Sequence, residues 1–120
     1  MPTVAALPRT FDLSLPDLAL VRGGIVRSHR ARGWWWSRDG DTPDAPRSDV
    51  PTVLLVHALT GSAKAGGEGG WWEPVIGPGR ALDPDKYRIV CFNNLGSCYG
   101  SSGPGVEGFP TDATLELTSL

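Results

Sequence analysis

The stretch TVLLVHALTG, residues 52–61, decides the fold class. Its first five residues, Thr52 to Val56, are rich in β-branched side chains and almost continuously apolar. Such a run is typical of a strand that is covered on both faces of a sheet. Arg88 to Phe92 is a second run of the same kind. Two buried strands of this type predict a parallel sheet in an α/β fold.

The residues before this strand predict a hairpin and two irregular segments. Leu18–Val21 and Ile25–Trp36 have the pattern of extended segments, and the turn signal Gly23-Gly24 joins them. We expect residues 1–17 to be irregular because prolines punctuate them. Residues 37–51 are rich in Asp and Pro, which predicts a solvated loop.

The rest of the chain is glycine-rich and offers little helix. Residues 58–79 carry seven glycines, and their prolines and glycines limit any helix to one turn around Glu73–Ile76. Asp83-Pro84-Asp85 predicts a turn. No segment has an amphipathic helical pattern over ten or more residues, although parallel strands need crossover connections to cover them. We therefore expect the 120 residues to be the opening portion of a single larger α/β domain.

Composition excludes several classes of protein. Eleven basic and 13 acidic residues leave a net charge of −2, so there is no electrostatic case for a nucleic-acid partner. No apolar run exceeds four residues, which is far too short to cross a bilayer, and the first 20 residues lack the pattern of a signal peptide. Two cysteines are too few for a disulfide scaffold and suit a reducing cytosol.

The segment His57–Gly61 is the first candidate site. A loop that directly follows a buried strand can turn a backbone N–H toward a reacting carbonyl, as half of an oxyanion hole. The alternative is a tight strand-to-loop turn in which His57 caps backbone groups. A general-base role for His57 is disfavoured because no acid stands at a suggestive position to orient it.

Two further patterns imitate chemical motifs. Residues 96–100, GSCYG, fit the cysteine form of a nucleophile elbow around Cys98, but the Gly103-Pro104-Gly105 that follows disfavours the helix an elbow needs. Residues 66–70 suggest a phosphate loop, but they lack the Gly-Lys-Ser/Thr ending and carry a glutamate that would repel phosphate. Cys91, inside the second strand, is interpreted as a small buried hydrophobe.

Five tryptophans stand in two runs, Trp34-Trp35-Trp36 and Trp71-Trp72. Neighbouring side chains of a strand face opposite sides, so at least one ring of the first run must point away from its neighbours. A stacking platform for sugars or single-stranded nucleic acid is one interpretation. Packing of the rings in the core is the interpretation we favour.

Taken in order, five motifs resemble the N-terminal part of the homoserine O-acetyltransferases, α/β-hydrolase-fold enzymes of methionine biosynthesis. These motifs are HALTGSA (57–63), GWW (70–72), IGPG (76–79), DPDKY (83–87) and NLGSCYGSSGP (94–104). The resemblance runs from roughly Leu18 to Pro110, which is most of this chain but only the first part of the family's enzyme. Succinyl transferases and some serine acyltransferases share these motifs, so both acyl donors stay open.

The resemblance implies the first strands of an α/β-hydrolase central sheet plus its oxyanion loop, and a double-displacement reaction. A serine on a nucleophile elbow would take the acetyl group from acetyl-CoA, and the homoserine hydroxyl would then attack the acetyl-enzyme. A histidine oriented by an aspartate would pass the protons. Leu59 is implied as a backbone oxyanion donor. Residues 1–120 contain no G-x-S-x-G, because GSSGP at 100–104 fails at its last position, so the triad cannot be placed in them.

Further expectations follow from the same resemblance. It implies small-molecule substrates, acetyl-CoA as a co-substrate, no bound cofactor or metal, a homodimer and a cytoplasmic location. Ser97 departs from the family pattern, where glycine is usual, and so does the triple tryptophan. The resemblance is lost after Thr114, which we expect to reflect a frameshift or an early stop.

Two interpretations therefore stay open. In the first, the sequence is part of an acyltransferase, and the 120 residues alone are inactive. In the second, it is a non-catalytic module that binds a ligand through its tryptophans and glycine-rich loop.

Overall fold

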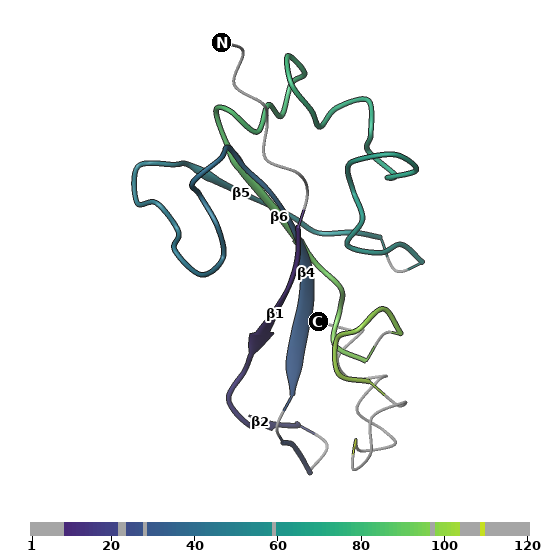
Figure 1. Cartoon of the computed structure of the whole chain (residues 1–120). Helices are drawn as coiled ribbons and strands as arrows, with labels where there is room; N and C mark the ends of the chain where they lie inside the picture. Colours follow the sequence, from purple (N-terminus) through teal and green to yellow (C-terminus); the bar gives the residue numbers. More distant parts are fainter. Residues whose placement is uncertain are drawn as a thin grey trace. The chain divides into compact units, whose positions relative to one another are not determined.

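The computed structural model describes residues 9–21, 24–27, 29–58, 60–96, 98–103 and 109. These residues contain six strands: β1 (Arg9–Ser14), β2 (Leu18–Ala19), β3 (Ile25–Val26), β4 (Arg30–Trp36), β5 (Thr52–Leu55) and β6 (Arg88–Phe92) (Figure 1). No helix occurs in this part of the chain, and so none that could span a membrane. The chain divides into two compact units, one of Met1–Phe11 with Gly33–Phe92 and one of Asp12–Arg32 with Asn93–Leu120.

Four strands form the main sheet, in the order β1-β4-β6-β5. Strand β5 runs parallel to β6, with Leu54 opposite Val90, and β4 runs antiparallel to β6, with Trp35 opposite the same residue. Figure 1 draws β5 and β6 side by side. The predicted parallel pair is therefore confirmed, with β6 at its predicted bounds and β5 one residue shorter than predicted. Because the two strands are parallel, their carboxyl ends lie at the same edge of the sheet.

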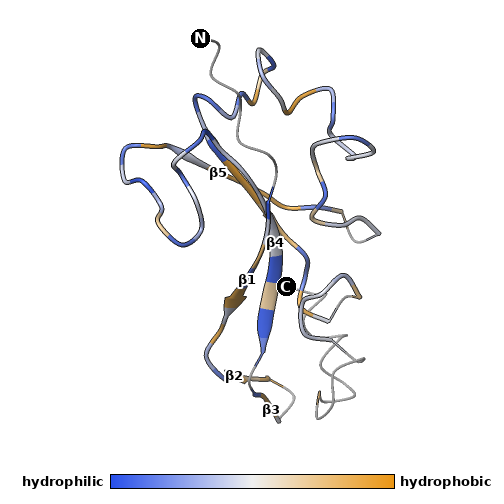
Figure 2. Ribbon diagram, in the orientation of Figure 1, coloured by the Kyte–Doolittle hydropathy of each residue, from blue (hydrophilic) through white to orange (hydrophobic). Residues whose placement is uncertain are grey.

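The core lies against β6, which has a strand on either side. Ile89 and Cys91 of this strand are fully buried, as the apolar run predicts. The core cluster combines them with residues from β4 and from the long segment between β5 and β6: Trp36, Ala63, Ala65 and Ile76. Figure 2 shows the apolar colour concentrated along this central part of the sheet.

The tryptophans of β4 pack on both faces of the sheet. Trp34 and Trp36 lie on one face with their rings stacked, 5.9 Å between centroids, and Trp36 is buried in the core. Trp35 is buried on the other face, where the Arg88 guanidinium lies 4.8 Å from its ring centroid. The favoured interpretation of core packing is confirmed for this run. Trp71 and Trp72 stack on each other but stay 43% and 40% exposed, so that interpretation is wrong for the second run.

Strand β5 is less covered than its sequence predicts. Leu54 is 61% exposed and the adjoining Val56 is 78% exposed, although burial on both faces was expected. The exposed Leu54 and Val56 alternate with the half-buried Val53 and Leu55, so one face of β5 is packed and nothing among the described residues covers the other.

Strand β1 corrects the expectation that residues 1–17 are irregular over its own residues, Arg9–Ser14, whereas residues 1–8 lie outside the described residues. Phe11 of this strand makes edge-to-face contacts with Trp35 and Phe92, at centroid distances of 5.6 Å and 5.3 Å. Residues 10–14, TFDLS, alternate polar and apolar side chains, which is the pattern of a half-covered edge strand. No proline lies within Arg9–Ser14, so each residue of the strand keeps its backbone N–H.

The predicted hairpin is confirmed but is short. Strands β2 and β3 pair antiparallel, with Leu18 opposite Val26, and the amide of Leu20 donates to the Gly24 carbonyl. Gly24 has a φ of +93°, a left-handed conformation that glycine adopts without strain. The expected single extended segment over 25–36 is instead two strands, β3 and β4, with separate partners.

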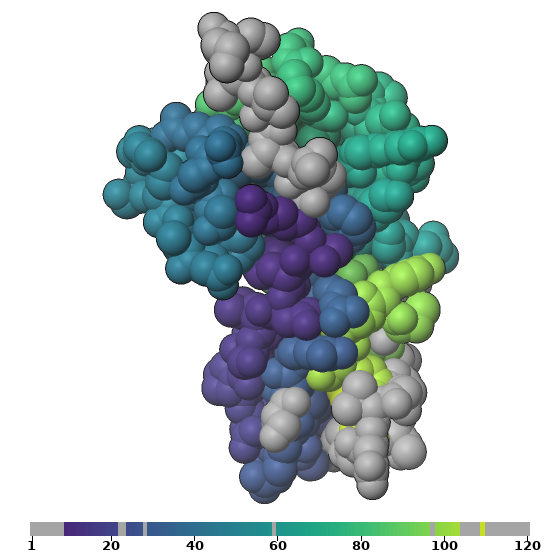
Figure 3. Space-filling view, in the orientation of Figure 1, coloured from purple at the N-terminus to yellow at the C-terminus, as the bar shows by residue number. Residues whose placement is uncertain are grey.

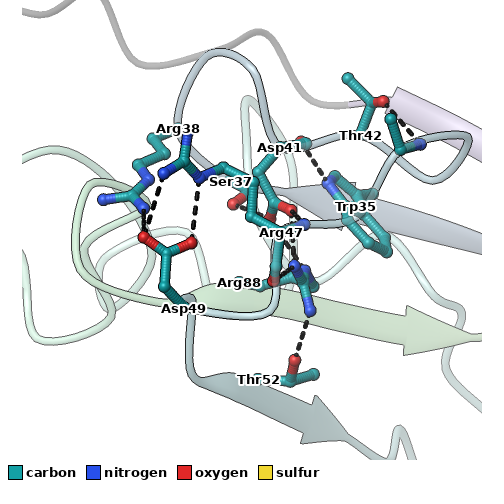
Figure 4. Close-up of polar contacts among 10 residues, drawn as sticks. Trp35, Ser37, Arg38, Asp41, Thr42, Arg47, Asp49, Thr52 and Arg88 are labelled. Atoms are coloured by element: carbon teal, nitrogen blue, oxygen red, sulfur yellow. Dashed lines mark hydrogen bonds and ion pairs between the residues drawn. The ribbon is translucent and has the colours of Figure 1, made fainter.

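The loop of residues 37–51 connects β4 to β5, and part of it is buried. Asp41 is fully buried in this loop and forms an ion pair with Arg88 (Figure 4). The Arg47 amide donates to the Asp41 carboxylate over 2.7 Å, and Trp35 Nε1 donates to the Asp41 carbonyl over 2.9 Å. The buried carboxylate folds the loop back on itself, and the loop appears as a compact lobe in Figure 3. A buried charge needs such partners, which is why the expectation of a solvated loop is wrong at Asp41.

Two predicted turns are present between the parallel strands. The Ile76 amide donates to the Trp72 carbonyl over 3.3 Å, which is one helical turn. Asp83 accepts hydrogen bonds at its backbone carbonyl from the amides of Lys86 and Tyr87. Its carboxylate accepts from the Asp85 amide, which is the local geometry of an Asx turn.

Candidate functional site

The candidate loop begins where β5 ends. His57 is buried, and its ring Nδ1 lies 2.6 Å from the carbonyl oxygen of Ala58. The Gly61 amide donates to the same oxygen over 2.8 Å. A carbonyl oxygen can only accept, so the contact places a proton on Nδ1. The interpretation of His57 as a cap of backbone groups is confirmed, and Leu59, the implied oxyanion donor, lies outside the described residues.

The root of this loop is also tied to the neighbouring strand. The His57 backbone amide donates a hydrogen bond to the thiol of Cys91 in β6. Burial raises the pKa of Cys91 to about 11, and the hydrogen bond from His57 offsets only part of that rise. A thiol with so high a pKa carries almost no thiolate at neutral pH. Cys91 is therefore a packing residue, as predicted, and is not a nucleophile.

The segment after the loop is held by hydrogen bonds to its own backbone carbonyls. Trp71 Nε1 donates to the Ser62 carbonyl over 2.7 Å, and the Trp72 amide donates to the Ala65 carbonyl over 2.7 Å. Ala63 and Ala65 are fully buried between these bonds. The Gly-rich sequence therefore forms a fixed structure that supports the residues just after β5.

Two of the glycines at 66–70, Gly66 and Gly70, serve close packing. A Cβ on Gly70 would lie 2.5 Å from the Gly66 carbonyl oxygen and 2.6 Å from that of Ala65, so no larger residue fits without a backbone shift. The Gly69 amide donates to the Glu73 carboxylate over 3.2 Å. A carboxylate of the chain itself occupies a donor that a phosphate would need.

Cys98 does not lie on a nucleophile elbow. The Gly96 amide donates to the Ser102 carbonyl over 2.7 Å, so the chain around Cys98 is a closed loop. The loop is entered through Gly96 and left through Gly100, whose φ angles are +87° and +102°. Residues 98–103 contain no helix, and residues 104–108 lie outside the described residues. Cys98 is exposed on this loop.

Sequence reasoning missed the role of two buried serines. Ser102 Oγ accepts from the Arg30 amide and Ser101 Oγ accepts from the Arg32 amide, each over 2.8 Å. Ser101 Oγ also donates to the Asn93 carbonyl over 2.6 Å. The two hydroxyl groups thus act as strand partners for β4, a role for which two adjacent serines carry no specific sequence signal.

No metal-binding cluster is present in the part of the chain that the structure describes. No three His, Cys, Asp or Glu side chains converge there. The two His residues lie in different units, and each contacts a backbone carbonyl, His57 that of Ala58 and His29 that of Pro16.

Comparisons with known proteins identify related sequences. No protein-family model matches the chain. A homoserine O-acetyltransferase from Deferribacter desulfuricans is 56% identical in an alignment of 59 positions that covers 43% of this chain and 16% of that protein. A serine O-succinyltransferase from Xanthomonas campestris pv. campestris is 40% identical in an alignment of 112 positions that covers 88% of this chain and 28% of that protein.

Solved structures share the fold. A homoserine O-acetyltransferase from Staphylococcus aureus superimposes with a TM-score of 0.67 at 27% identity, over 87% of this chain and 30% of that one. An acetylester hydrolase from Corynebacterium glutamicum has a TM-score of 0.58 at 21% identity, over 87% of this chain and 26% of that one, and supports the fold alone. The chain thus spans less than a third of the length of each of these proteins. The expected partial α/β-hydrolase fold is confirmed, and in sequence and structure the chain is similar to part of the homoserine O-acetyltransferases and, in sequence, to part of a serine O-succinyltransferase.

Proposed function

We propose that the complete protein that carries this sequence transfers an acyl group from an acyl-CoA thioester to the side-chain hydroxyl of a small amino acid. Acetyl-CoA is the proposed donor and homoserine the proposed acceptor. Similarity to a homoserine O-acetyltransferase at 56% identity supports this assignment. The serine O-succinyltransferase, which matches 88% of the chain, supports succinyl transfer to serine as the second candidate.

The observation that carries the proposal is the ordered turn directly after β5. There the Ala58 carbonyl accepts hydrogen bonds from both the His57 ring and the Gly61 amide. In acyl transfer, an oxyanion hole needs a backbone N–H that is already oriented before charge develops on the carbonyl oxygen. Leu59 is the residue we assign to that N–H, in keeping with the family resemblance.

The proposed reaction has two steps. A serine hydroxyl outside residues 1–120 attacks the thioester carbonyl, its C–S bond breaks, CoA leaves as the thiol, and the acyl group stays on the serine as an ester. The amino-acid hydroxyl then attacks that ester, which frees the serine and yields the O-acylated product. The Leu59 N–H would stabilise the oxyanion in both steps. Both units of residues 1–120 would then belong to one α/β-hydrolase domain of a cytoplasmic homodimer.

The test is a product assay of the complete protein with four substrate pairs. Acetyl-CoA or succinyl-CoA is combined with homoserine or serine, and CoA release and the mass of the acylated amino acid are measured. We expect acetyl transfer to homoserine to have the largest kcat/KM. A preference for succinyl-CoA with serine would establish the second candidate, and no transfer with any pair would refute the proposal.

Residues 1–120 alone provide the matched control. They contain no G-x-S-x-G motif, so we expect no transfer from them with any of the four pairs. Transfer by this fragment that Cys98→Ala abolishes would instead assign the nucleophile to Cys98.

A further inference from the structure

The second tryptophan run is exposed, yet it is fixed in place. The rings of Trp71 and Trp72 stack, with 5.8 Å between their centroids and 22° between their planes, and both side chains stay exposed. Trp71 Nε1 donates to the Ser62 carbonyl over 2.7 Å, and the Trp72 amide donates to the Ala65 carbonyl over the same distance. Because hydrogen bonds already hold both residues, a ligand that binds to the rings would cost little conformational entropy.

The exposed part of the Trp71 ring is apolar. An indole has one polar atom, its N–H, and in Trp71 this group is hydrogen-bonded to the chain itself. Carbon and π surface remain for a ligand. Planar rings stack on such a surface, and every nucleobase can do so because each has a π face of its own. The stacked pair therefore favours a ligand with a planar ring.

A cation lies in the same segment. Lys64 is exposed, and its carbonyl accepts a hydrogen bond from the Trp71 amide over 3.3 Å. Its ammonium lies 4.0 Å from the position a Cβ would take on Gly69, two residues before Trp71. Within the described residues, no carboxylate pairs with this ammonium.

The charge of Lys64 decides between two kinds of occupant for this surface. An apolar protein segment laid over it would remove water from the ammonium and offer no partner in return. A planar ring that carries phosphate groups would cover the indoles and pair with the ammonium as well. The surface therefore fits a nucleotide better than an apolar segment.

We propose that Trp71, Trp72 and Lys64 bind the adenine nucleotide of the acyl-CoA donor, with the adenine stacked on the indoles and a phosphate paired with the Lys64 ammonium. This inference rests on the proposed function, because it assigns a binding site for that donor. Acetyl-CoA and succinyl-CoA carry the same adenosine 3′,5′-bisphosphate unit, so the site serves both candidate donors. Its residues bind the donor and take no part in the transfer step.

Calorimetric titration of the complete protein with adenosine 3′,5′-bisphosphate tests the site without acyl transfer. Trp72→Ala should weaken binding by about 5- to 100-fold, the range expected when one base loses its aromatic stacking partner. Trp72→Phe keeps a ring and should stay within a few-fold of the wild type. Lys64→Gln should weaken binding and reduce its dependence on salt. Glu68→Gln, which removes an exposed carboxylate of the same segment, should strengthen binding.

A truncated donor separates nucleotide binding from chemistry. Trp72→Ala should raise KM for acetyl-CoA with little change in kcat, because the stacking is present in the ground state and in the transition state alike. S-acetylpantetheine has the thioester but no nucleotide, so with this donor Trp72→Ala and the wild type should have the same kcat/KM. Tyr99→Ala removes another exposed aromatic ring and, as the matched control, should leave KM for acetyl-CoA unchanged.

The outcomes separate this inference from the proposed function. A wild type that transfers acyl groups, with unchanged KM and bisphosphate affinity in Trp72→Ala, would overturn the nucleotide site and leave acyl transfer standing. Equal losses of kcat/KM with acetyl-CoA and S-acetylpantetheine would do the same. Bisphosphate binding that depends on Trp72, in a protein that transfers no acyl group, would refute the proposed function and support the site. Unfolding temperatures are measured in parallel, and if Trp72→Ala does not fold, the titration of Lys64→Gln decides.

Discussion

Replacing Asp41 by alanine is expected to lower the free energy of unfolding of the complete protein by about 3–5 kcal/mol, the usual cost of removing one partner of a buried ion pair. The carboxylate is fully buried, and Arg88 Nε donates to it over 2.8 Å. The Ser37 hydroxyl and the Arg47 amide donate to the same carboxylate. Its removal leaves the Arg88 guanidinium, which is 11% exposed, without its carboxylate partner.

The contribution of Asp41 to the free energy of unfolding is expected to fall as the pH falls. Burial alone raises the pKa of this carboxyl, but the hydrogen bonds from Arg88, Arg47 and Ser37 lower it from 3.8 to about 2. A carboxyl whose pKa is lower in the folded state stabilises the protein above its unfolded-state pKa and loses that effect as the pH falls toward its folded-state pKa. The difference in stability between wild type and Asp41→Ala should thus shrink by about 2 kcal/mol between about pH 5 and pH 2.

Urea denaturation of the two proteins at several pH values measures this effect. Asp44→Ala is the matched control, because Asp44 is an exposed aspartate of the same loop, and its cost should stay below about 0.5 kcal/mol. The variant that removes both partners, Asp41→Ala with Arg88→Met, should cost less than the sum of the single changes. If Asp41→Ala costs no more than Asp44→Ala, the loop is not held by this ion pair.

The second large effect is expected from Trp36. Its ring lies in the core against β6, it is 3% exposed, and it stacks on Trp34. Truncation to alanine should cost about 3–5 kcal/mol, from lost burial and from the cavity that remains. The ring also lies 3.2 Å from the position a Cβ would take on Gly66, so the cavity would open beneath the segment that follows the candidate loop.

Two variants control for the size and the polarity of this ring. Trp72→Ala removes an equal side chain that is 40% exposed, and it should cost clearly less than Trp36→Ala. Trp36 Nε1 is buried and has no hydrogen-bond partner among the described residues. Trp36→Phe loses no hydrogen bond there and should recover most of the stability lost in Trp36→Ala. Equal midpoints in urea for Trp36→Ala and Trp72→Ala would contradict the assigned core.

The strands that could be predicted are those that contain an unbroken run of apolar side chains. Residues 53–56 and 89–92 are apolar without interruption, and β5 and β6 form over these two runs. Strand β1 was missed because its neighbouring prolines suggest irregular chain, although residues 10–14 alternate polar and apolar side chains. Its strand structure depends on Phe11 packing against Trp35 and Phe92, which are distant in sequence.

The candidate site was predictable in position but not in its contacts. A histidine after a buried strand indicates a loop at the carboxyl edge of the sheet, and His57 is found there. The His57 ring donates a hydrogen bond to the Ala58 carbonyl. This contact depends on the backbone conformation of residues 57–61, which cannot be predicted from the spacing of residues in the sequence. Asp41 was missed for a related reason, because its partner Arg88 lies 47 residues away in a strand.

The most direct test of the account is the mass of the complete protein after brief mixing with acetyl-CoA in the absence of an acceptor. An acyl-enzyme mechanism predicts a gain of about 42 Da on a serine outside residues 1–120, and loss of that gain when homoserine is added. A mass gain that corresponds to a succinyl group, seen with succinyl-CoA instead, would support the same mechanism with succinyl-CoA as the donor. An unchanged mass with both thioesters, together with no release of CoA, would contradict the assignment of this protein as an O-acyltransferase.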